Sequence, residues 1–182
     1  MTTDREALLS STAELLTRRP AASMDEIAKA AGVSRATLHR YYAGRDALVR
    51  ALEELALSRL DTALDAVRPE EGDPQDAVRR VIAGAEPLAG FLAFLITENQ
   101  LFEPGRQHEG WRRIDDRLCA LFTRGQESGH FRVDLTAAFL TEALYALITA
   151  AAWAVQDGKV AARSATPMTA ELLLGGALRR TR

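Results

Sequence analysis

The cationic residues between positions 34 and 50 are the part of this sequence best suited to chemistry. Four arginines occur there with a single acid, Asp46, so a local charge of +3 stands in a chain whose net charge is −2. Guanidinium groups bind phosphates, whose counterions are released on binding, and they can donate two parallel hydrogen bonds to guanine. The cluster therefore predicts an interface with double-stranded DNA.

Side chains in and near this cluster could divide the contacts between bases and phosphates. Arg35 or Arg40 could bind guanine with two hydrogen bonds, and the methyl or hydroxyl group of Thr37 could touch thymine or a phosphate. Ser23 stands at the expected start of a helix, where its hydroxyl and the free backbone amides suit a phosphate oxygen.

Residues for catalysis or metal binding form no recognisable pattern. The three histidines, at 39, 108 and 130, are far apart, and no His-x-x-x-His or Glu-x-x-His pair occurs. No glycine-rich phosphate loop follows a strand. Cys119 is the only cysteine, which excludes an internal disulfide and a CxxC metal site. We expect no catalytic residue, no metal ligand and no cofactor.

Helices are the elements expected to position these residues. The apolar residues include 33 Ala and 25 Leu against 8 Val and 5 Ile, and this usage favours helices over strands. The 182 residues suffice for a small module joined to a larger one. We predict an all-α fold with domains at 1–46 and 47–182. Expected helices cover about 4–18, 24–31, a segment after Ser34, 44–68, 75–85, 88–101, 107–128, 135–157 and 167–180.

Start and stop signals in the first domain place two short helices around a tight turn. Residues 23–26, Ser-Met-Asp-Glu, form a capping box that opens the first of them. Gly32 can adopt the positive φ that ends a helix, and Ser34 can cap the next helix two residues later. Such a pair of helices is typical of a helix-turn-helix.

The miniature core of this helix-turn-helix is expected to contain Ala28, Val33, Leu38 and Tyr42. With Leu38 and Tyr42 facing inward, the helical period turns the other side chains of the second helix toward other sides, several of them toward solvent. These side chains are Arg35, Ala36, Thr37, His39, Arg40 and Tyr41.

Five short motifs follow one another between residues 23 and 48. They are Ser23-Met24-Asp25-Glu26-Ile27-Ala28, Ala31-Gly32-Val33-Ser34, Thr37-Leu38, Tyr41-Tyr42 and Arg45-Asp46-Ala47-Leu48. Together they resemble the DNA-binding domain of the TetR family of bacterial transcriptional regulators. The resemblance implies that the rest of the chain is a helical domain that binds a ligand and dimerises.

The resemblance also implies roles for individual residues. Arg35, Ala36 and Thr37 would approach bases. His39 holds the position where the family commonly has a phosphate-contacting tyrosine, and Arg45 stands in for the usual lysine, which is also a phosphate contact. The predicted DNA-binding residues are therefore Ser23, Arg35, Ala36, Thr37, His39, Arg40, Tyr41 and Arg45.

One stripe of the expected helix at 135–157 is wholly apolar and is a candidate dimer interface. We expect it to pack with the helix at 167–180 against a second copy of the chain, because two helices from each copy form a four-helix interface. Gly175 and Gly176 would allow a close approach. The alternative is an ordinary core within one chain. The stripe contains Ala137, Leu140, Leu144, Leu147, Ile148, Ala151 and Val155.

A second stripe of the same helix mixes aromatic and polar residues and could line a pocket for a mostly apolar small molecule. Glu142 lies in it, and a buried carboxylate would need a cationic ligand, an arginine or a proton. The alternative is again core packing. The predicted ligand-binding residues are Phe91, Phe94, Leu95, Trp111, Leu118, Phe122, Glu142, Tyr145, Thr149 and Trp153.

Residues 137–155 approach the length of a membrane span and hold one charge, Glu142. Many of them are alanines, which contribute little transfer energy, so we interpret the segment as a helix buried on two sides and expect no membrane partner. No signal sequence opens the chain, and a single cysteine suits a reducing compartment. We therefore expect a cytoplasmic protein.

These observations together predict a homodimeric transcriptional regulator, most simply a repressor, that binds a palindromic operator through its first domain. A small-molecule effector in the second domain would change the spacing of the two DNA-binding domains through the helix at 45–68. Two alternatives stay open. One is a helical small-molecule-binding protein or enzyme whose DNA-binding head does not function, and the other is a membrane-associated helical protein.

Overall fold

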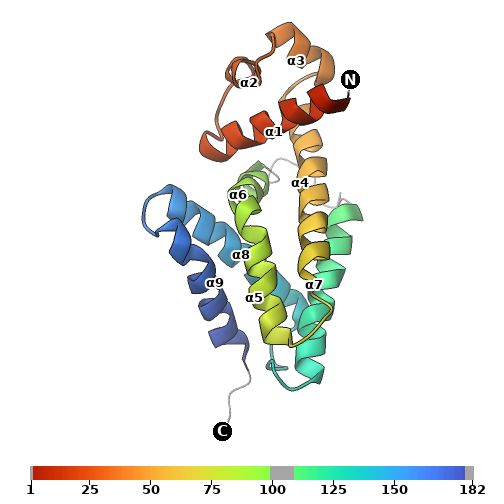
Figure 1. Ribbon diagram of the computed structural model, residues 1–182, viewed down its shortest axis with the longest axis vertical. Helices are drawn as coiled ribbons and strands as arrows, with labels where there is room; N and C mark the ends of the chain where they lie inside the picture. Colours follow the sequence, from red (N-terminus) through yellow and green to blue (C-terminus); the bar gives the residue numbers. More distant parts are fainter. Residues whose placement is uncertain (1, 99–108, 179–182) are drawn as a thin grey trace. The chain divides into compact units, whose positions relative to one another are not determined.

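The computed structural model describes residues 2–98 and 109–178, which form helices and turns with one isolated bridge between Phe131 and Leu178. This confirms the predicted all-α fold. The expected helix ends at 101, 107 and 180, and His108, lie outside the described residues. Figure 1 shows α1 (Thr2–Arg18), α2 (Met24–Ala30), α3 (Arg35–Tyr41), α4 (Arg45–Val67), α5 (Pro74–Ala85), α6 (Ala89–Glu98), α7 (Glu109–Glu127), α8 (Ala137–Gln156) and α9 (Ala162–Ala177), and a short 3-10 helix, η1 (Glu86–Leu88), joins α5 to α6.

Two compact units make up the chain. Unit 1 contains Met1–Ser58 and Gly90–Glu103, and unit 2 contains Arg59–Ala89 and Pro104–Arg182. The first part of α4 therefore belongs to unit 1 and the remainder to unit 2, while α6 lies almost entirely in unit 1. The unit with the helix-turn-helix is thus built from two separate stretches of the chain.

The turn between α2 and α3 forms as its local signals predict. Ser23 caps α2 in a capping box with Glu26, and the hydroxyl of Ser34 caps α3 by accepting a hydrogen bond of 3.1 Å from the backbone N–H of Thr37. Gly32 has a φ of +68°, in the left-handed region that favours glycine. The predicted helix-turn-helix geometry is therefore confirmed.

Helix α6 packs into the apolar core of unit 1. A methyl group built on Gly90 would lie 2.6 Å from Cγ2 of Thr17 in α1, so the absence of a side chain allows the two helices to approach. Residues 91–95 of α6 are all buried. Helices α1 to α4 complete this core with side chains that have no exposed surface, namely Leu16, Ile27, Leu38, Leu48 and Leu52.

Arginine side chains hold the loop between α4 and α5 in unit 2. Arg80 donates from Nε to the carbonyl of Val67 at 2.9 Å. Arg124 of α7 donates to the carbonyls of Pro69 and Gly72 at 2.8 and 2.6 Å. Guanidinium groups thus satisfy backbone acceptors that no helix can satisfy at this point, and they tie the loop to α5 and α7.

The last described helix begins earlier than we expected. Helix α9 starts at Ala162, five residues before Pro167, which we had expected to open it. Its first turn is tight, because the N–H of Ser164 donates to the carbonyl of Ala161 at 2.8 Å. Pro167 is exposed and removes only one backbone donor. Burial of Ala165 favours a helical turn before the proline.

Gly125 is required where α7 meets the segment that follows it. A Cβ built on Gly125 would lie 2.1 Å and 2.3 Å from ring atoms of Phe131, whose side chain has no exposed surface. We expect Gly125→Ala to lower the free energy of unfolding by about 1–3 kcal/mol, because the ring cannot move without disturbing the core.

Urea denaturation measures this effect. Ala120→Gly, at an exposed position of α7, is the control, because it changes helix propensity alone. It should lower the free energy of unfolding by about 1 kcal/mol. Unchanged or increased stability in Gly125→Ala would contradict the tight contact with Phe131.

Among the residues that the structure describes, two helical stretches are long and apolar enough to cross a membrane by length and composition alone, Pro74–Glu98 and Ala137–Gln156. In their most apolar windows 44% and 28% of the residues are buried within the chain. Both stretches supply core side chains, including Val78, Leu95 and Leu144. We interpret them as core helices, and the low burial in α8 reflects an apolar face that remains exposed.

Candidate nucleic-acid interface and effector region

Helix α3 has one buried and one exposed side. Leu38 has no exposed surface, and Tyr42, directly after the helix, is also buried. Their four-residue spacing places the remaining side chains of α3 on other sides of the helix. Of the residues predicted to bind DNA, Arg35, Ala36, His39 and Arg40 are exposed, and Thr37 and Tyr41 are partly buried.

Both arginines of α3 have neighbours that restrict their side chains. Arg35 donates from Nη1 to Oδ2 of Asp25 in α2 at 3.1 Å. The guanidinium carbon of Arg40 lies 5.6 Å from the centre of the Tyr41 ring, a distance that permits a cation–π interaction. From the sequence, Asp25 is predicted only as part of the capping box, because nothing in local spacing links it to a residue ten positions later.

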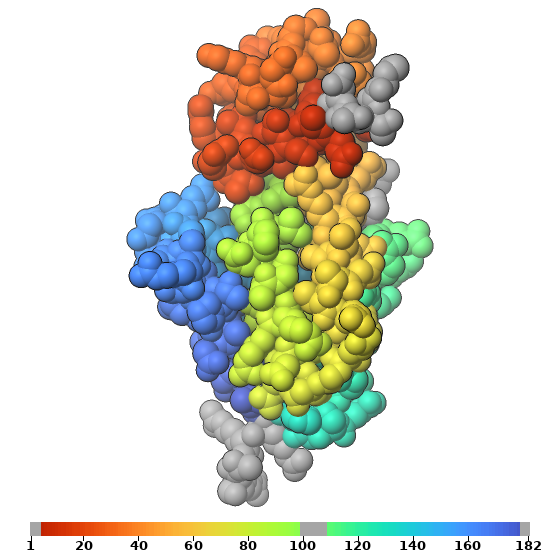
Figure 2. All heavy atoms as spheres, viewed as in Figure 1, coloured from red at the N-terminus to blue at the C-terminus, as the bar shows by residue number. Residues whose placement is uncertain are grey.

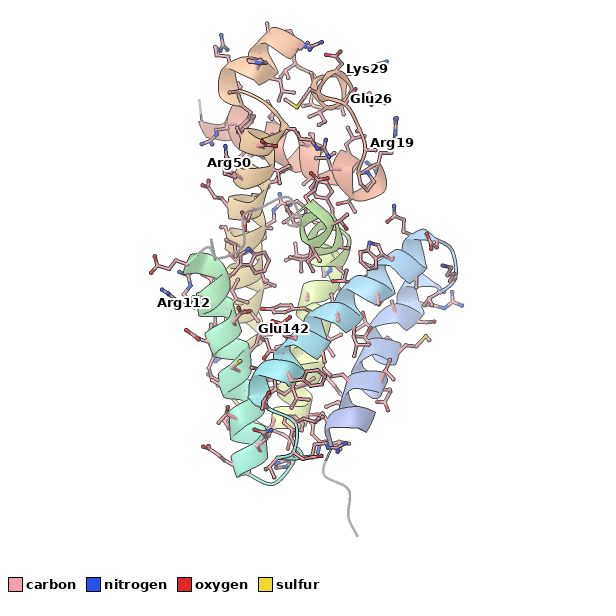
Figure 3. All side chains as sticks on the ribbon, turned by 180° about the vertical axis from the view of Figure 1, so that it is seen from behind. Arg19, Glu26, Lys29, Arg50, Arg112 and Glu142 are labelled. Carbon is pink, nitrogen blue, oxygen red and sulfur yellow. The ribbon has the colours of Figure 1, made fainter. Side chains whose placement is uncertain are left out.

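Ser23 uses its polar atoms within the capping box. Its hydroxyl accepts a hydrogen bond from the N–H of Glu26 at 3.3 Å and donates to Oε2 of Glu26 at 2.9 Å. Hydrogen bonds from the backbone and hydroxyl of Ser23, and then Arg19, lower the pKa of Glu26 below its ordinary value. Figure 3 shows Arg19 beside Glu26. A phosphate at this helix start would therefore lie near an ionised carboxylate.

Arg45, predicted to contact a phosphate, has partners inside unit 1. It donates to the carbonyls of Pro20 and Ala22 and to both carboxylate oxygens of Glu98. The side chains of Arg45 and Glu98 are 30% and 13% exposed. Glu98 could not be predicted as this partner from the sequence, because it lies 53 residues further along the chain in another helix.

The predicted ligand-binding residues fall in both units. Those of α6, at 91, 94 and 95, are buried in unit 1, and the other seven lie in unit 2. In unit 2, Phe122 has no exposed surface, and its ring centre lies 5.7 Å from that of Phe131. Phe122 is therefore a core residue of unit 2. Leu118 and Thr149 are also buried, Trp111 and Tyr145 are partly buried, and Glu142 and Trp153 are exposed.

Tyr145 and Asp115 form a polar pair between α8 and α7. The hydroxyl of Tyr145 donates to Oδ1 of Asp115 at 2.8 Å. Burial raises the pKa of Tyr145 above its ordinary value, and the hydrogen bond and charge of Asp115 raise it further. Tyr145 is therefore a neutral donor at physiological pH, and it orients a partly buried carboxylate.

The two stripes predicted on α8 do not face as we expected. Leu140, Leu144 and Ile148, from the stripe assigned to the dimer interface, are buried within the chain. Glu142 is exposed, so the expectation of a buried carboxylate was wrong and no buried partner is required. The apolar stripe therefore packs against the rest of unit 2, and the opposite side of α8 is the exposed one.

An exposed apolar face extends over α8 and α9 instead. We define it by Phe139, Ala146, Ala150 and Trp153 of α8 and by Met168, Leu172, Gly175 and Gly176 of α9, and we call it the α8–α9 face. Its four large side chains are 46% to 65% exposed. In Figure 2 the blue surface of α8 and α9 forms one edge of unit 2. Methyl groups built on the two glycines would meet no atom within 4 Å.

The described residues hold no group of three or more His, Cys, Asp and Glu side chains arranged for a metal ion. Cys119 is partly buried, and its Sγ lies 3.4 Å from the hydroxyl oxygen of Thr141.

Known proteins resemble this chain in the helix-turn-helix segment and over nearly its whole length. Residues 8–52 match the family described as bacterial regulatory proteins, tetR family. The HTH-type transcriptional regulator NfxB of Pseudomonas aeruginosa is 33% identical over 174 residues, which cover 94% of this chain and 93% of NfxB. The HTH-type transcriptional repressor LfrR of Mycolicibacterium smegmatis is 32% identical over 124 residues, which cover 68% of this chain and 60% of LfrR.

A solved structure extends the likeness to the fold. The crystal structure of the TetR-like transcriptional regulator LfrR from Mycobacterium smegmatis, in complex with proflavine, has a TM-score of 0.80 at 24% identity and covers 97% of each chain. The match with NfxB spans nearly the whole of both sequences, and the helix-turn-helix lies within the matched family segment. This chain therefore belongs to the TetR family of bacterial DNA-binding transcriptional regulators.

Proposed function

We propose that the protein is a cytoplasmic repressor that binds a palindromic operator as a dimer and is released from it by a small molecule. The observation that carries the DNA-binding part is the outer side of α3, where Arg35, His39 and Arg40 are exposed on a short helix held by a buried leucine. Residues at the start of a recognition helix reach base edges, and cations around it meet phosphates. Thr37, Ala36 and Tyr41 complete this surface, with Ser23 at the start of α2.

The α8–α9 face is the proposed dimer interface. Soluble monomers rarely expose contiguous apolar patches of this kind, and a two-fold mate would cover the same patch on both copies. The two exposed glycines of α9 allow a partner helix to approach closely. This assignment keeps the helices at 135–157 and 167–180 that the sequence indicated but uses the opposite side of the first.

Selection of bound sequences from random double-stranded DNA tests the operator proposal. We expect enrichment of two inverted half-sites whose centres are about one helical turn apart, ~34–36 Å, because the two recognition helices of a dimer enter successive major grooves. Recovery of no preferred sequence would contradict a sequence-specific repressor.

The effector is proposed to be a mostly apolar small molecule with a positive charge. Asp115 is a partly buried carboxylate that accepts a hydrogen bond from Tyr145, and Trp111 lies four residues before it on α7. LfrR, a relative with the same fold, has been solved in complex with proflavine, an aromatic amine. A cation beside a carboxylate in apolar surroundings gains a strong hydrogen bond.

Fluorescence titration with proflavine tests this class of effector. We expect Asp115→Asn to weaken binding about tenfold, because a hydrogen bond to a charged group contributes about 1.5–3 kcal/mol. Asp116→Asn, at the exposed neighbouring position of α7, removes the same charge and should bind like the unaltered protein. Equal affinity in both variants would remove Asp115 from the effector site.

A further inference from the structure

We propose that Arg45 is a positioning residue that fastens the loop between α1 and α2 to the end of α6 through Glu98, and that it does not contact a DNA phosphate. This inference rests on the proposed DNA-binding function and reassigns one residue of the predicted interface. It follows from the partners of the guanidinium group, all of which lie within unit 1.

Most donors of the Arg45 guanidinium group are already used. Nε and Nη2 donate to Oε2 and Oε1 of Glu98, both at 3.2 Å, the two-point geometry that arginine forms with carboxylates. Nη1 donates to the carbonyl of Ala22 at 3.0 Å, and Nη2 also donates to the carbonyl of Pro20 at 2.6 Å. These bonds occupy four of the five donors of an arginine, so a two-point contact with a phosphate would have to displace at least one of them.

The two carbonyls belong to the loop that leads into α2. Ala22 is 2% exposed, and its N–H donates to the carbonyl of Arg19 at 3.0 Å. Ser23 follows directly and caps α2. A buried carbonyl that loses its donor costs free energy comparable to a lost hydrogen bond. Arg45 therefore holds the path of the chain at the point where the helix-turn-helix begins.

The carboxylate of Glu98 depends on Arg45 as its cationic partner. The carboxylate side chain is only 13% exposed, and a charge with so little contact with water needs a cationic partner. Arg45 is the first residue of α4, and Glu98 is the last residue of α6. The pair thus joins the beginning of one helix to the end of another, within the unit that carries α3.

The substitution Arg45→Lys distinguishes the two roles. An ammonium group can bind a phosphate, but a single nitrogen cannot reach two carboxylate oxygens and two carbonyls in the fixed planar geometry of arginine. We expect Arg45→Lys to weaken operator binding about tenfold, nearly as much as Arg45→Gln does. Affinity close to that of the unaltered protein in Arg45→Lys would overturn the proposal.

The salt dependence of binding gives an independent readout. Each phosphate contact contributes about 0.9 to the slope of the logarithm of affinity against the logarithm of salt concentration. We expect Arg45→Gln to lower affinity with little change in this slope. A slope smaller by about 0.9 per protomer would show that Arg45 neutralises a phosphate, and would overturn the proposal.

Glu98→Gln tests whether Glu98 strengthens or weakens operator binding. It removes a negative charge from the DNA-binding unit, which alone would strengthen binding to DNA, yet we expect weaker binding, by roughly fivefold, because the tie to Arg45 is lost. Asp46→Asn removes an exposed charge beside Arg45 and serves as the matched control, with unchanged or slightly stronger binding. Stronger binding by Glu98→Gln would mean that Glu98 merely competes with phosphate for Arg45.

Arg40→Ala on the same operator separates failure of this inference from failure of the proposed function. If the unaltered protein selects no DNA, the proposed function fails. If it binds and Arg40→Ala weakens binding while Arg45→Lys does not, only the positioning role of Arg45 fails. Circular dichroism checks the helix content of each variant, and Arg45→Lys and Glu98→Gln change the fewest atoms.

Discussion

Leu172→Arg is expected to convert the protein from a dimer to a monomer at micromolar concentration. Leu172 lies at the centre of the exposed side of α9 and is 65% exposed in the single chain. Burial of one leucine contributes about 1.5–3 kcal/mol, and a two-fold interface contains two copies of it. The dimer dissociation constant should therefore rise by about 100-fold or more, before the cost of burying the arginines is added.

Light scattering during gel filtration measures this change. Val133→Arg is the matched control, because Val133 is 80% exposed but lies outside the α8–α9 face. It should leave the dimer intact. A Leu172→Arg protein that remains dimeric would show that another surface forms the dimer, and the operator affinity of the same variant should fall because a monomer reaches only one half-site.

Arg35→Ala is expected to remove the preference for one base pair in each half-site of the operator. Arg35 opens α3, and residues at the start of a recognition helix contact base edges. A two-point contact with guanine contributes about 1–3 kcal/mol of discrimination. Two half-sites double this free energy, so affinity for the selected operator should fall by about 30-fold or more. The sequence that the variant selects should also change.

Arg40→Ala should behave differently if Arg40, which lies at the end of α3, contacts a phosphate and not the guanine that the sequence also allowed. It should weaken binding to all sequences by a similar factor and reduce the salt slope by about 0.9 per protomer. Arg112→Ala, an exposed position on α7 of unit 2, is the control for charge alone and should change neither property. Identical selection profiles for Arg35→Ala and the unaltered protein would contradict base recognition by Arg35.

Local signals made the helix-turn-helix predictable from sequence. Caps at Ser23 and Ser34 and the left-handed Gly32 act within a few residues, so the chain specifies these helix ends without reference to distant contacts. Burial of Leu38 and Tyr42 followed from helical spacing alone. These features also place the exposed side of α3.

Orientation and long-range pairing were less predictable. Helix α8 is apolar on both sides, so periodicity could not show which side meets the core, and Glu142 was placed inside in error. The partner of Arg45 lies in another helix 53 residues away, and no local pattern indicates it. Pro167 suggested a helix start, whereas packing of Ala165 begins the helix sooner.

The division of unit 1 into two stretches of sequence has a consequence for how such a regulator can evolve. The unit that contains the helix-turn-helix is not one continuous segment of the sequence, since α6 contributes core side chains and Glu98 to it. A recombination that moved only the first 46 codons into another family member would place Thr17 against a foreign residue at position 90 and would separate Arg45 from Glu98. Hybrids between family members should therefore keep operator preference intact only when both stretches are inherited together.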